Sequence, residues 1–342
     1  MFEIRTDPQI TTGRTGGVVT VSDIRAIHGL PDPASDDAPS GAGLTVAVMD
    51  SGVDESHEVF DGIEVEHHNF TGAPDEPYDD VGHGTAVAGL IAQLSPGIER
   101  IVDLRIFGKS GSGNSKPIFD AYDWARSHAD ELATINLSWG SSERNREIDH
   151  EHTRLMNAGV QDVVSAGNTG ETSGSPATAM DAYGIGAMTE ERELTRFSSY
   201  NPGAVENPDT VALGKDVRLP RATDTSLGTV LDDDYVKASG TSFSAPIATA
   251  AMNLFVEVRE RASELPFERT AVDIPGTPED VHGYIRYDRA VESDAAGAEV
   301  ELFDLPFTDY EGVALPAGWA NGATRAVLER ESDRETVVRF ER

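Results

Sequence analysis

The sequence predicts an α/β fold in which helices cover both faces of a central parallel β-sheet. Between residues 44 and 262, short apolar runs alternate with longer stretches of helical pattern. Strands separated by helices imply crossover connections and therefore parallel pairing. The chain has 342 residues, which is enough for one large domain, or for a large domain with a small appendage.

The expected elements follow from this alternation. In chain order they are strand 44–49, helix 83–93, strand 101–107, helix 116–128, strand 133–137, helix 147–158, strands 160–165 and 183–188, and helix 242–261. Chemistry in such a sheet concentrates at the carboxyl ends of the strands. Asp50 and Asn168 lie just beyond strands, while His83 and Ser242 open helices. We therefore expect these four residues on one rim of the sheet.

The two ends of the chain differ from this central part in their pattern of apolar and polar residues. We expect an N-terminal extension over 1–20, the main domain over 21–291 and a small β-rich C-terminal extension over 292–342. Alternating apolar and polar residues at 299–303 and 336–340 indicate strands in the last segment. A charged, partly mobile tail is the competing interpretation.

The composition is strongly acidic. Sixty Asp and Glu residues against 27 Lys and Arg give a formal net charge of −33, and only four of the basic residues are Lys. This combination resembles proteins from halophilic archaea, in which molar salt shortens the Debye length to about 3 Å and screens self-repulsion. A nucleic acid is not expected as a partner, because phosphate recognition needs a basic surface.

The compartment is less constrained by the sequence. Without Cys, the chain can form neither disulfides nor thiolate metal sites. The N-terminal stretch lacks the apolar core of a signal peptide. No segment approaches the roughly 18 consecutive apolar residues of a membrane helix, so no membrane partner is expected. Because the sequence starts with Met, we favour a cytoplasmic location, with a secreted mature form as the alternative.

Asp50 stands in the stretch VAVMDSGVD, just beyond an apolar strand. On these residues alone it is half of an aspartic-protease dyad, a metal ligand, the orienting acid of a serine triad, or part of a turn without chemistry. A dyad needs a second Asp-Thr-Gly or Asp-Ser-Gly triplet before a suitable apolar strand, and the sequence has none. The other three interpretations depend on the rest of the chain.

His83 stands in the stretch DVGHGTAVAG, between two glycines at the start of a predicted helix. A single histidine is more often structural than catalytic. The small residues around this one, however, indicate that another part of the molecule approaches its backbone closely. His83 is therefore a candidate catalytic residue.

Ser242 stands in the stretch KASGTSFSAP, at the N-terminus of a long apolar helix. Such a terminus presents unpaired backbone N–H groups and the positive end of the helix dipole. A serine there is also an ordinary N-cap. Pro246 falls in the first turn, where it forfeits little hydrogen bonding, and Gly240 permits close approach of a substrate backbone.

Asn168 follows a predicted strand in the glycine-rich stretch VVSAGNTG. Its carboxamide is either a donor to a developing oxyanion or part of an ordinary turn.

Taken together, the four stretches resemble the subtilisin-like serine peptidases, the subtilase family. The spacings also fit, because His83 follows Asp50 by 33 residues and Ser242 follows His83 by 159.

The resemblance extends over most of the chain and implies a mechanism. It begins at about residue 21, where VSDIRAIHGL is similar to a surface helix of the family, and ends at about 291, after HGYIRYDRAV. It implies a subtilisin-like fold and peptide hydrolysis through an acyl-enzyme. Ser242 would attack the carbonyl, His83 would transfer the proton, and Asp50 would orient the imidazole. The backbone N–H of Ser242 and the side chain of Asn168 would bind the oxyanion.

The resemblance also implies that two segments, NLSWGSS and GKSGSGN, form main-chain hydrogen bonds with an extended peptide, which lies between them as an added strand. The residues it assigns to substrate binding are Ser138, Trp139 and Gly140, then Ser165, Ala166 and Gly167 around the specificity pocket, and Gly108, Gly111 and Gly113 on the other side of the peptide. Trp139 stands where the family often has a smaller residue, and it would either narrow or cap a subsite. The acidic surface suggests tolerance of basic residues in the substrate.

Two family features are missing from the sequence. Val59 stands where many secreted subtilases have an acidic calcium ligand, and no loop follows LIAQL to complete that site. We therefore expect no required cofactor and no assignable metal site, while weak calcium sites elsewhere stay open. No pro-domain is visible before residue 21. Either it has been removed, or the chain folds unaided, or a protein inhibitor or regulator restrains the activity.

The segment 223–235 lengthens the approach to Ser242 and contains four acidic residues. It forms either a gate or a solvated loop.

Two function classes remain at this point: an active serine endopeptidase that takes peptide or protein substrates, and a non-catalytic subtilase-fold scaffold that binds peptides or partners. The four intact positions favour the enzyme.

Overall fold

The computed structural model describes most of the chain. The described residues are 2–3, 17–35, 37–76, 78–113, 115–180, 182–201, 207–275, 277–278, 281–295, 325–332 and 335–341. For 2–3, 294–295, 325–332 and 335–341 the structure describes the backbone alone. Most of the expected N-terminal extension and the expected strand at 299–303 lie outside these residues.

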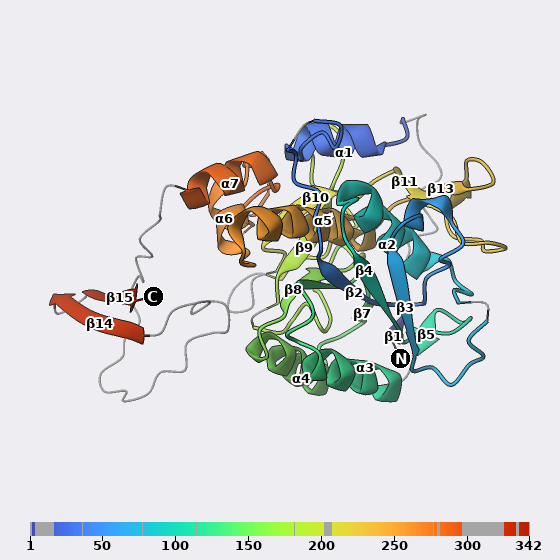
Figure 1. The fold of residues 1–342 in the computed structure, drawn as a ribbon, viewed down its shortest axis with the longest axis horizontal. Coiled ribbons are helices and arrows are strands. Elements are labelled where there is room, and N and C mark those ends of the chain that lie inside the picture. Colours follow the sequence, from blue (N-terminus) through green and yellow to red (C-terminus); the bar gives the residue numbers. More distant parts are fainter. Residues whose placement is uncertain are drawn as a thin grey trace.

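A seven-stranded parallel sheet forms the centre of the fold (Figure 1). In spatial order its strands are β10 (Thr210–Leu213), β9 (Gly184–Met188), β8 (Gln161–Ser165), β6 (Thr134–Leu137), β2 (Thr45–Asp50), β4 (Arg100–Arg105) and β3 (Glu64–Asn69). Every neighbouring pair is parallel. The predicted fold class is confirmed.

The five predicted strands correspond to β2, β4, β6, β8 and β9, and their limits differ from the predicted ones by at most two residues. Two strands of the sheet were not predicted. β3 has the sequence EVEHHN and lies at the edge of the sheet, so it lacks the apolar signal of a buried strand. β10 has only four residues, TVAL, which is too short for a clear pattern.

Helices cover both faces of the sheet (Figure 1). The helices α3 (Ser115–Ser127) and α4 (Arg146–Asn157) lie on one face, while α2 (His83–Leu94) and α5 (Thr241–Arg259) lie on the other. These four correspond to the predicted helices, with limits that differ by at most two residues. The α5 helix crosses β6, β8, β9 and β10 and packs against α2.

The central strand β2 shows why the sheet is buried on both faces. Val46 and Val48 pack into the core under α2 and α5, whereas Ala47 and Met49 pack into the core under α3 and α4. All four side chains are fully buried. A strand that serves two cores needs apolar residues at every position, which is the continuous run that the sequence shows.

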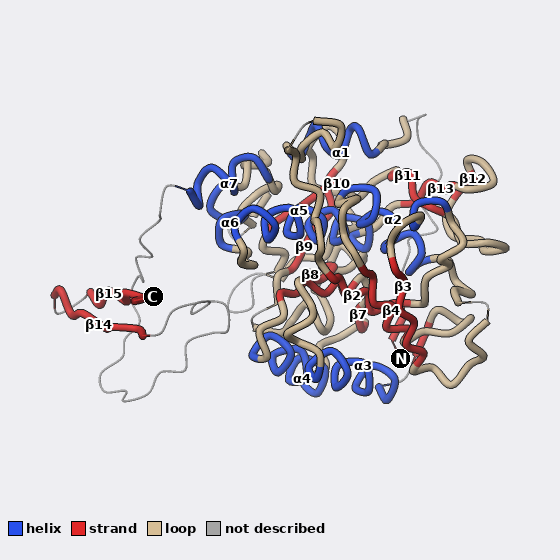
Figure 2. Tube along the Cα trace, in the orientation of Figure 1, coloured by secondary structure: helices blue, strands red, loops and turns tan. Residues whose placement is uncertain are grey.

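Shorter elements complete the described part of the chain. They are α1 (Val21–His28), η1 (Glu58–Phe60), α6 (Leu265–Thr270), α7 (Tyr287–Ala295), an antiparallel sheet of β5 (Ser112–Gly113), β1 (Phe2–Glu3) and β7 (Gly140–Ser141), a second of β11 (Val217–Pro220), β13 (Tyr235–Ala238) and β12 (Thr229–Val230), and the hairpin of β14 (Arg325–Ser332) and β15 (Glu335–Glu341). Figure 2 shows how much loop joins them. The expected strand at 336–340 falls within β15, and the domain limits stay predictions.

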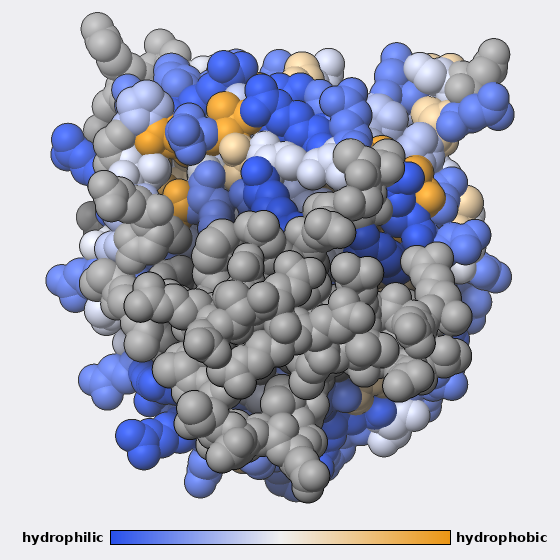
Figure 3. Space-filling model, turned by 90° about the vertical axis from the view of Figure 1, so that its left-hand side faces the viewer, coloured by the Kyte–Doolittle hydropathy of each residue, from blue (hydrophilic) through white to orange (hydrophobic). Residues whose placement is uncertain are grey.

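The described part of the surface is mostly hydrophilic on the face drawn in Figure 3. Among the described residues, the exposed large apolar side chains are Met180, Val230, Leu231 and Val258. Within those residues, none of the helices combines the length and the apolar character that a membrane crossing requires.

Candidate active site

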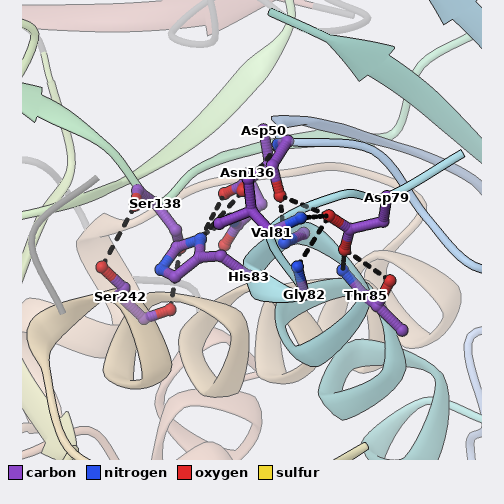
Figure 4. A network of polar contacts seen from close by, with 11 residues as sticks. Asp50, Asp79, Val81, Gly82, His83, Thr85, Asn136, Ser138 and Ser242 are labelled. Atoms are coloured by element: carbon purple, nitrogen blue, oxygen red, sulfur yellow. Dashed lines mark hydrogen bonds and ion pairs between the residues drawn. The ribbon is translucent and has the colours of Figure 1, made fainter. Parts of the chain in front are cut away.

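The four candidate residues all lie at the carboxyl edge of the parallel sheet, as predicted. Asp50 is the last residue of β2, and Asn168 follows β8 by three positions. His83 is the first residue of α2, and Ser242 is the second residue of α5. Figure 4 shows His83 between Asp50 and Ser242.

Asp50 and His83 form a buried pair. The Nδ1 of His83 lies 2.8 Å from Oδ1 of Asp50 and 3.0 Å from Oδ2, and both side chains are fully buried. The backbone N–H of Ser51 donates to Oδ1 of Asp50 at 2.7 Å. A carboxylate on Nδ1 holds the imidazole in the tautomer that leaves Nε2 free of its proton. Nε2 is buried and has no hydrogen-bond partner among the described residues.

Close backbone contact brings this pair together. The N–H of Gly84 donates to Oγ of Ser51 at 2.9 Å. A Cβ atom added to Gly84 would lie 2.2 Å from the carbonyl oxygen of Gly52. The small residues around His83 are therefore required by the turn that follows Asp50, which is the close approach that the sequence indicated.

A second carboxylate, Asp79, ties the two turns together (Figure 4). Its Oδ1 accepts hydrogen bonds from Oγ of Ser51 at 3.0 Å and from the N–H groups of Val81 and Gly82. Its Oδ2 accepts from the N–H and the hydroxyl of Thr85 in the first turn of α2. Burial raises the pKa of Asp79, and these hydrogen bonds oppose that rise.

Ser242 exchanges hydrogen bonds with the segment that follows β6. Its hydroxyl donates to the carbonyl of Ser138 at 3.1 Å, and the Ser138 hydroxyl donates to the carbonyl of Ser242 at 2.9 Å. The Nδ2 of Asn136 donates to Oγ of Ser138 at 2.8 Å, and the Asn136 Oδ1 accepts from Thr249 in α5. The start of α5 is thus fixed to the end of β6.

The carboxamide of Asn168 is oriented by the residue before Ser242. Its Oδ1 accepts hydrogen bonds from the N–H of Thr241 at 2.8 Å and from the Thr241 hydroxyl at 3.0 Å. Because both acceptor contacts use Oδ1, the Nδ2 donor faces away from them. Asn168 and Ser242 both line the same cavity.

This cavity, of about 40 Å³, contains most of the predicted substrate-binding residues. Those lining it are Ser138, Trp139, Gly140, Ser165, Ala166 and Gly167. The structure therefore brings both predicted walls together beside Ser242. Every lining residue among those described is uncharged, since the others are Ser141, Ser142, Thr169, Thr172, Gly174 and Ser199.

Trp139 is oriented mainly toward the core. Its ring packs edge-on against Phe107 and Tyr122, with ring centres 6.0 and 6.5 Å apart, and only 2% of the residue is exposed. Its Nε1 is buried without a hydrogen-bond partner among the described residues. Trp139 therefore stiffens the wall of the cavity by packing into the core behind it.

The third predicted set of substrate residues does not line the cavity. Gly113 belongs to the short strand β5 (Ser112–Gly113), Gly111 precedes that strand, and Gly108 lies at the start of the same loop. Asn114, the last residue of the matching segment, lies outside the described residues. The acidic side chains of the loop 223–235 are all exposed.

Among the described residues, no group of three or more His, Asp or Glu side chains is arranged to hold a metal ion. The cofactor requirement stays a prediction.

Sequence reasoning missed the residues that support the four candidates. Asp79 stands four residues before His83, and a carboxylate just before a helix is a recognisable capping signal. Asn136 is a buried polar residue within the apolar strand β6, which is also detectable in the sequence. Thr241 gives no separate signal in the sequence, because its hydrogen bonds to Asn168 depend on the fold.

Comparison with known proteins identifies the family of the chain. A family model described as the Subtilase family matches residues 41–281. A thermophilic serine proteinase of Bacillus sp. (strain AK1) is 30% identical over 259 residues, which cover 72% of this chain and 61% of that protein. Subtilisin-like protease 2 of Trichophyton equinum is 33% identical over 185 residues, which cover 51% and 43%. The chain thus spans 61% and 43% of the length of these two relatives, less than two thirds of each.

Two solved structures share the fold. A cold adapted subtilisin-like serine proteinase superposes with a TM-score of 0.61 at 24% identity, covering 75% of this chain and 92% of that one. A lanthipeptide protease gives a TM-score of 0.63 at 21% identity, covering 75% and 89%. These two likenesses show the fold, and the family model, which matches more than half of the chain, shows that the chain belongs to the subtilase family.

Proposed function

We propose that the protein is a serine endopeptidase that uses Asp50, His83 and Ser242 as a catalytic triad. The observation that carries the proposal is the buried contact of 2.8 Å between Asp50 and His83, beside a serine at the N-terminus of α5. Family membership supports the same reaction class.

Ser242 is the nucleophile. Its Oγ attacks the substrate carbonyl carbon while its proton passes to Nε2 of His83, and Asp50 stabilises the imidazolium. The proton then goes to the leaving amine as the peptide bond breaks. Water attacks the resulting ester while His83 takes its proton, and His83 returns that proton to Ser242 as the acid product leaves. In the structure the Ser242 hydroxyl donates to the carbonyl of Ser138. When a substrate N–H donates to that carbonyl instead, the hydroxyl is released and can donate to Nε2 of His83.

The oxyanion is bound by the backbone N–H of Ser242 and by Nδ2 of Asn168. The positive end of α5 contributes to the same site. Thr241 supports this role, because its two hydrogen bonds to Oδ1 fix which end of the Asn168 carboxamide faces the cavity. An amide held in place before the reaction stabilises the charge without reorganisation.

The substrate is an extended peptide or protein chain. The side chain next to the cleaved bond enters the cavity walled by Ser138, Ala166 and Gly167. Because the described walls carry no charge, we assign this pocket to uncharged side chains, while the acidic surface around it still favours basic residues elsewhere in the substrate.

An active-site serine reagent tests the proposal. We expect a fluorophosphonate probe at molar salt to label the wild-type protein, and the Ser242→Ala variant to remain unlabelled. Labelling that survives the substitution contradicts the assignment of Ser242. If a folded wild-type protein never reacts, the chain is a subtilase-fold scaffold that binds peptides without cutting them.

The acidic composition supports a further part of the proposal, adaptation to high salt. With a net charge of −33, the compact state is favoured when salt screens repulsion between surface carboxylates.

The triad needs no metal or organic cofactor for the steps above. Calcium, if bound, therefore acts on stability and not on chemistry.

A further inference from the structure

A second cavity adjoins the candidate site at Asn168. It has a volume of about 580 Å³ and shares Asn168 and Thr169 with the cavity of about 40 Å³ described above, the first cavity. Its other walls come from the segment after β9, at Thr189 and 193–197, and from Lys215 after β10. The loop that follows β6, which walls the first cavity, does not line the second one.

The proposed reaction defines what this second cavity faces. The oxyanion lies at Nδ2 of Asn168, and the side chain on the acyl side of the cleaved bond enters the first cavity. The carbonyl carbon joins that acyl side to the leaving nitrogen, so the leaving fragment extends from Asn168 away from the first cavity. Because the two cavities meet at Asn168 and share no wall beyond Thr169, the second one lies along the leaving side of the substrate.

Two basic side chains, Arg196 and Lys215, line the second cavity. Neither forms an ion pair within the described part of the chain, and Asp216, next to Lys215 in the sequence, is paired with Lys237 at 3.2 Å. Glu193 is the one acidic residue among the described lining residues. Two positive charges against one negative charge leave a local excess of positive charge in a chain whose net charge is −33. A cavity of this sign attracts an anion.

The wall also offers hydroxyl groups that suit a carboxylate. Thr195 lines the cavity with 6% of the residue exposed, and its buried Oγ1 has no hydrogen-bond partner among the described residues. A buried hydroxyl without an acceptor favours a ligand that supplies one. Glu191, which does not line the cavity, already responds to this surrounding. Hydrogen bonding from its own backbone N–H and from Thr189 lowers its pKa, slight burial opposes this, and the charge of Lys215 lowers the pKa further.

We propose that the second cavity binds a carboxylate on the leaving side of the cleaved bond, with Lys215 and Arg196 as the specificity-determining residues. The inference rests on the proposed function. The carboxylate belongs either to an Asp or Glu side chain in the first two residues of the leaving fragment, or to the free C-terminus of a short leaving fragment. Since the contact is partly exposed, it selects by several-fold and weakens as salt is added. The acidic surface elsewhere repels the same group, so the selection is local to this cavity.

Internally quenched peptides that differ only at the first or second position after the cleaved bond test this inference. At the lowest salt concentration at which circular dichroism shows a folded protein, we expect kcat/KM for Glu to exceed that for Gln by about 3- to 10-fold. Lys215→Gln and Arg196→Gln should each move this ratio toward one. Arg269→Gln removes the same charge from an exposed residue of α6 outside the cavity lining, and it should keep the wild-type ratio.

A second set of peptides identifies the source of the carboxylate. Here the leaving fragment consists of one or two neutral residues that end in a free carboxylate or in an amide. A preference for the free carboxylate that Lys215→Gln removes assigns the cavity to the C-terminus of the substrate, whereas a Glu preference in the first set assigns it to an acidic side chain. Either result supports the inference. The absence of both overturns it, as does a preference that falls equally in Lys215→Gln and Arg269→Gln or that neither cavity variant changes.

A binding experiment separates this inference from the proposed function. Fluorescent peptides with Glu or Gln at the same position are titrated into Ser242→Ala protein, with and without Lys215→Gln, and fluorescence anisotropy is recorded. We expect several-fold tighter binding of the Glu peptide, and loss of the difference with Lys215→Gln, whether or not the wild type shows catalysis. Equal binding of both peptides contradicts the carboxylate site. Catalysis without any preference retains the peptidase and rejects the site, whereas a preference in binding with an inert wild type retains the site and rejects the peptidase.

Discussion

The hydroxyl of Ser51 donates a hydrogen bond of 3.0 Å to the buried carboxylate of Asp79. The same carboxylate accepts from the first turn of α2, where His83 lies. Asp79 therefore links the turn after Asp50 to the start of the helix that carries His83, without contacting either side chain itself. Since it sets their relative position, its removal should affect both stability and turnover.

Replacing Asp79 by Asn should slow turnover by roughly 10- to 100-fold, because small misplacements of reacting groups carry costs of this size. It should also lower the free energy of unfolding by about 1–3 kcal/mol, since buried donors lose their acceptor. Peptidase kinetics well below the melting temperature, with circular dichroism to confirm folding, would measure both. Asp61→Asn, an exposed carboxylate after η1, is the control. Wild-type kcat in folded Asp79→Asn would refute the positioning role.

Substitutions in the Asp50–His83 pair should have large effects on kcat. His83→Ala removes the proton acceptor and should reduce kcat by several orders of magnitude. Asp50→Asn keeps the shape but no longer fixes the tautomer, and a loss on the order of 10⁴-fold is expected. Burst and steady-state kinetics with a p-nitroanilide peptide would measure the losses. Near-normal turnover in either variant would exclude the triad.

The role of Asn168 should appear in kcat and not in KM. Asn168→Ala is expected to lower kcat by about 10²-fold with KM little changed, because the contact to the oxyanion strengthens only in the transition state. Thr241→Val keeps one of the two hydrogen bonds to Asn168 and should lose only a few-fold. If Asn168→Ala changed KM alone, its carboxamide would bind the ground state and not the oxyanion.

The stability of the protein should depend on pH through His67. Its Nδ1 lies 2.9 Å from Oδ2 of Asp103. Burial lowers the pKa of His67, but the hydrogen bond and charge of Asp103, together with the nearby carboxylate of Glu55, outweigh this effect and raise the pKa overall. Burial raises the pKa of Asp103 to about 6, and the contact with His67 opposes that rise.

Because the pKa of His67 is higher in the folded state, protonated His67 contributes stability below about pH 6.5 that is lost as the pH rises through the folded pKa. Since Asp103 loses its charge below a pKa of about 6, the ion pair is strongest just above pH 6. The difference in melting temperature between wild type and His67→Gln should therefore be larger at pH 6 than at pH 9, at constant salt. A difference independent of pH would show that the ion pair contributes nothing.

Removing salt should destabilise the protein. At a net charge of −33, lowering the ionic strength from molar to about 10 mM lengthens the Debye length from about 3 Å to about 30 Å. Surface carboxylates then repel one another over most of the domain, so the melting temperature should fall. Differential scanning calorimetry across this range is the measurement, and a flat profile would remove the halophilic interpretation.

Much of the fold could be predicted because its central strands serve two cores. The continuous apolar run of β2 and the long apolar α5 are strong local signals, and their limits differ by at most two residues from the predicted ones. β3 could not be recognised, because Glu64, Glu66 and the histidines lie at a polar sheet edge. Its strand conformation depends on pairing with β4, which is a tertiary effect.

The same distinction applies to the site. Asp50, His83, Asn168 and Ser242 stood out because glycines and small residues surround them, and such residues report close backbone approach. The pairing of β1 with β5 and β7 could not be predicted, since two residues carry no periodicity. It depends on strand edges that are far away in the sequence.

Main chain packs directly on main chain where Gly84 meets Gly52, with no side chain between them. The separation of Asp50 and His83 therefore depends on direct contact between peptide groups at the two glycines, together with the Asp79 carboxylate that joins the same two turns. Under the proposed function, changes in substrate preference are expected from the loops that follow β6 and β8, which wall the cavity. The same loops contain Asn168 and the Ser138 carbonyl that accepts from Ser242, so a redesign of the pocket must keep these two groups in place, whereas the glycine contact lies outside the cavity lining.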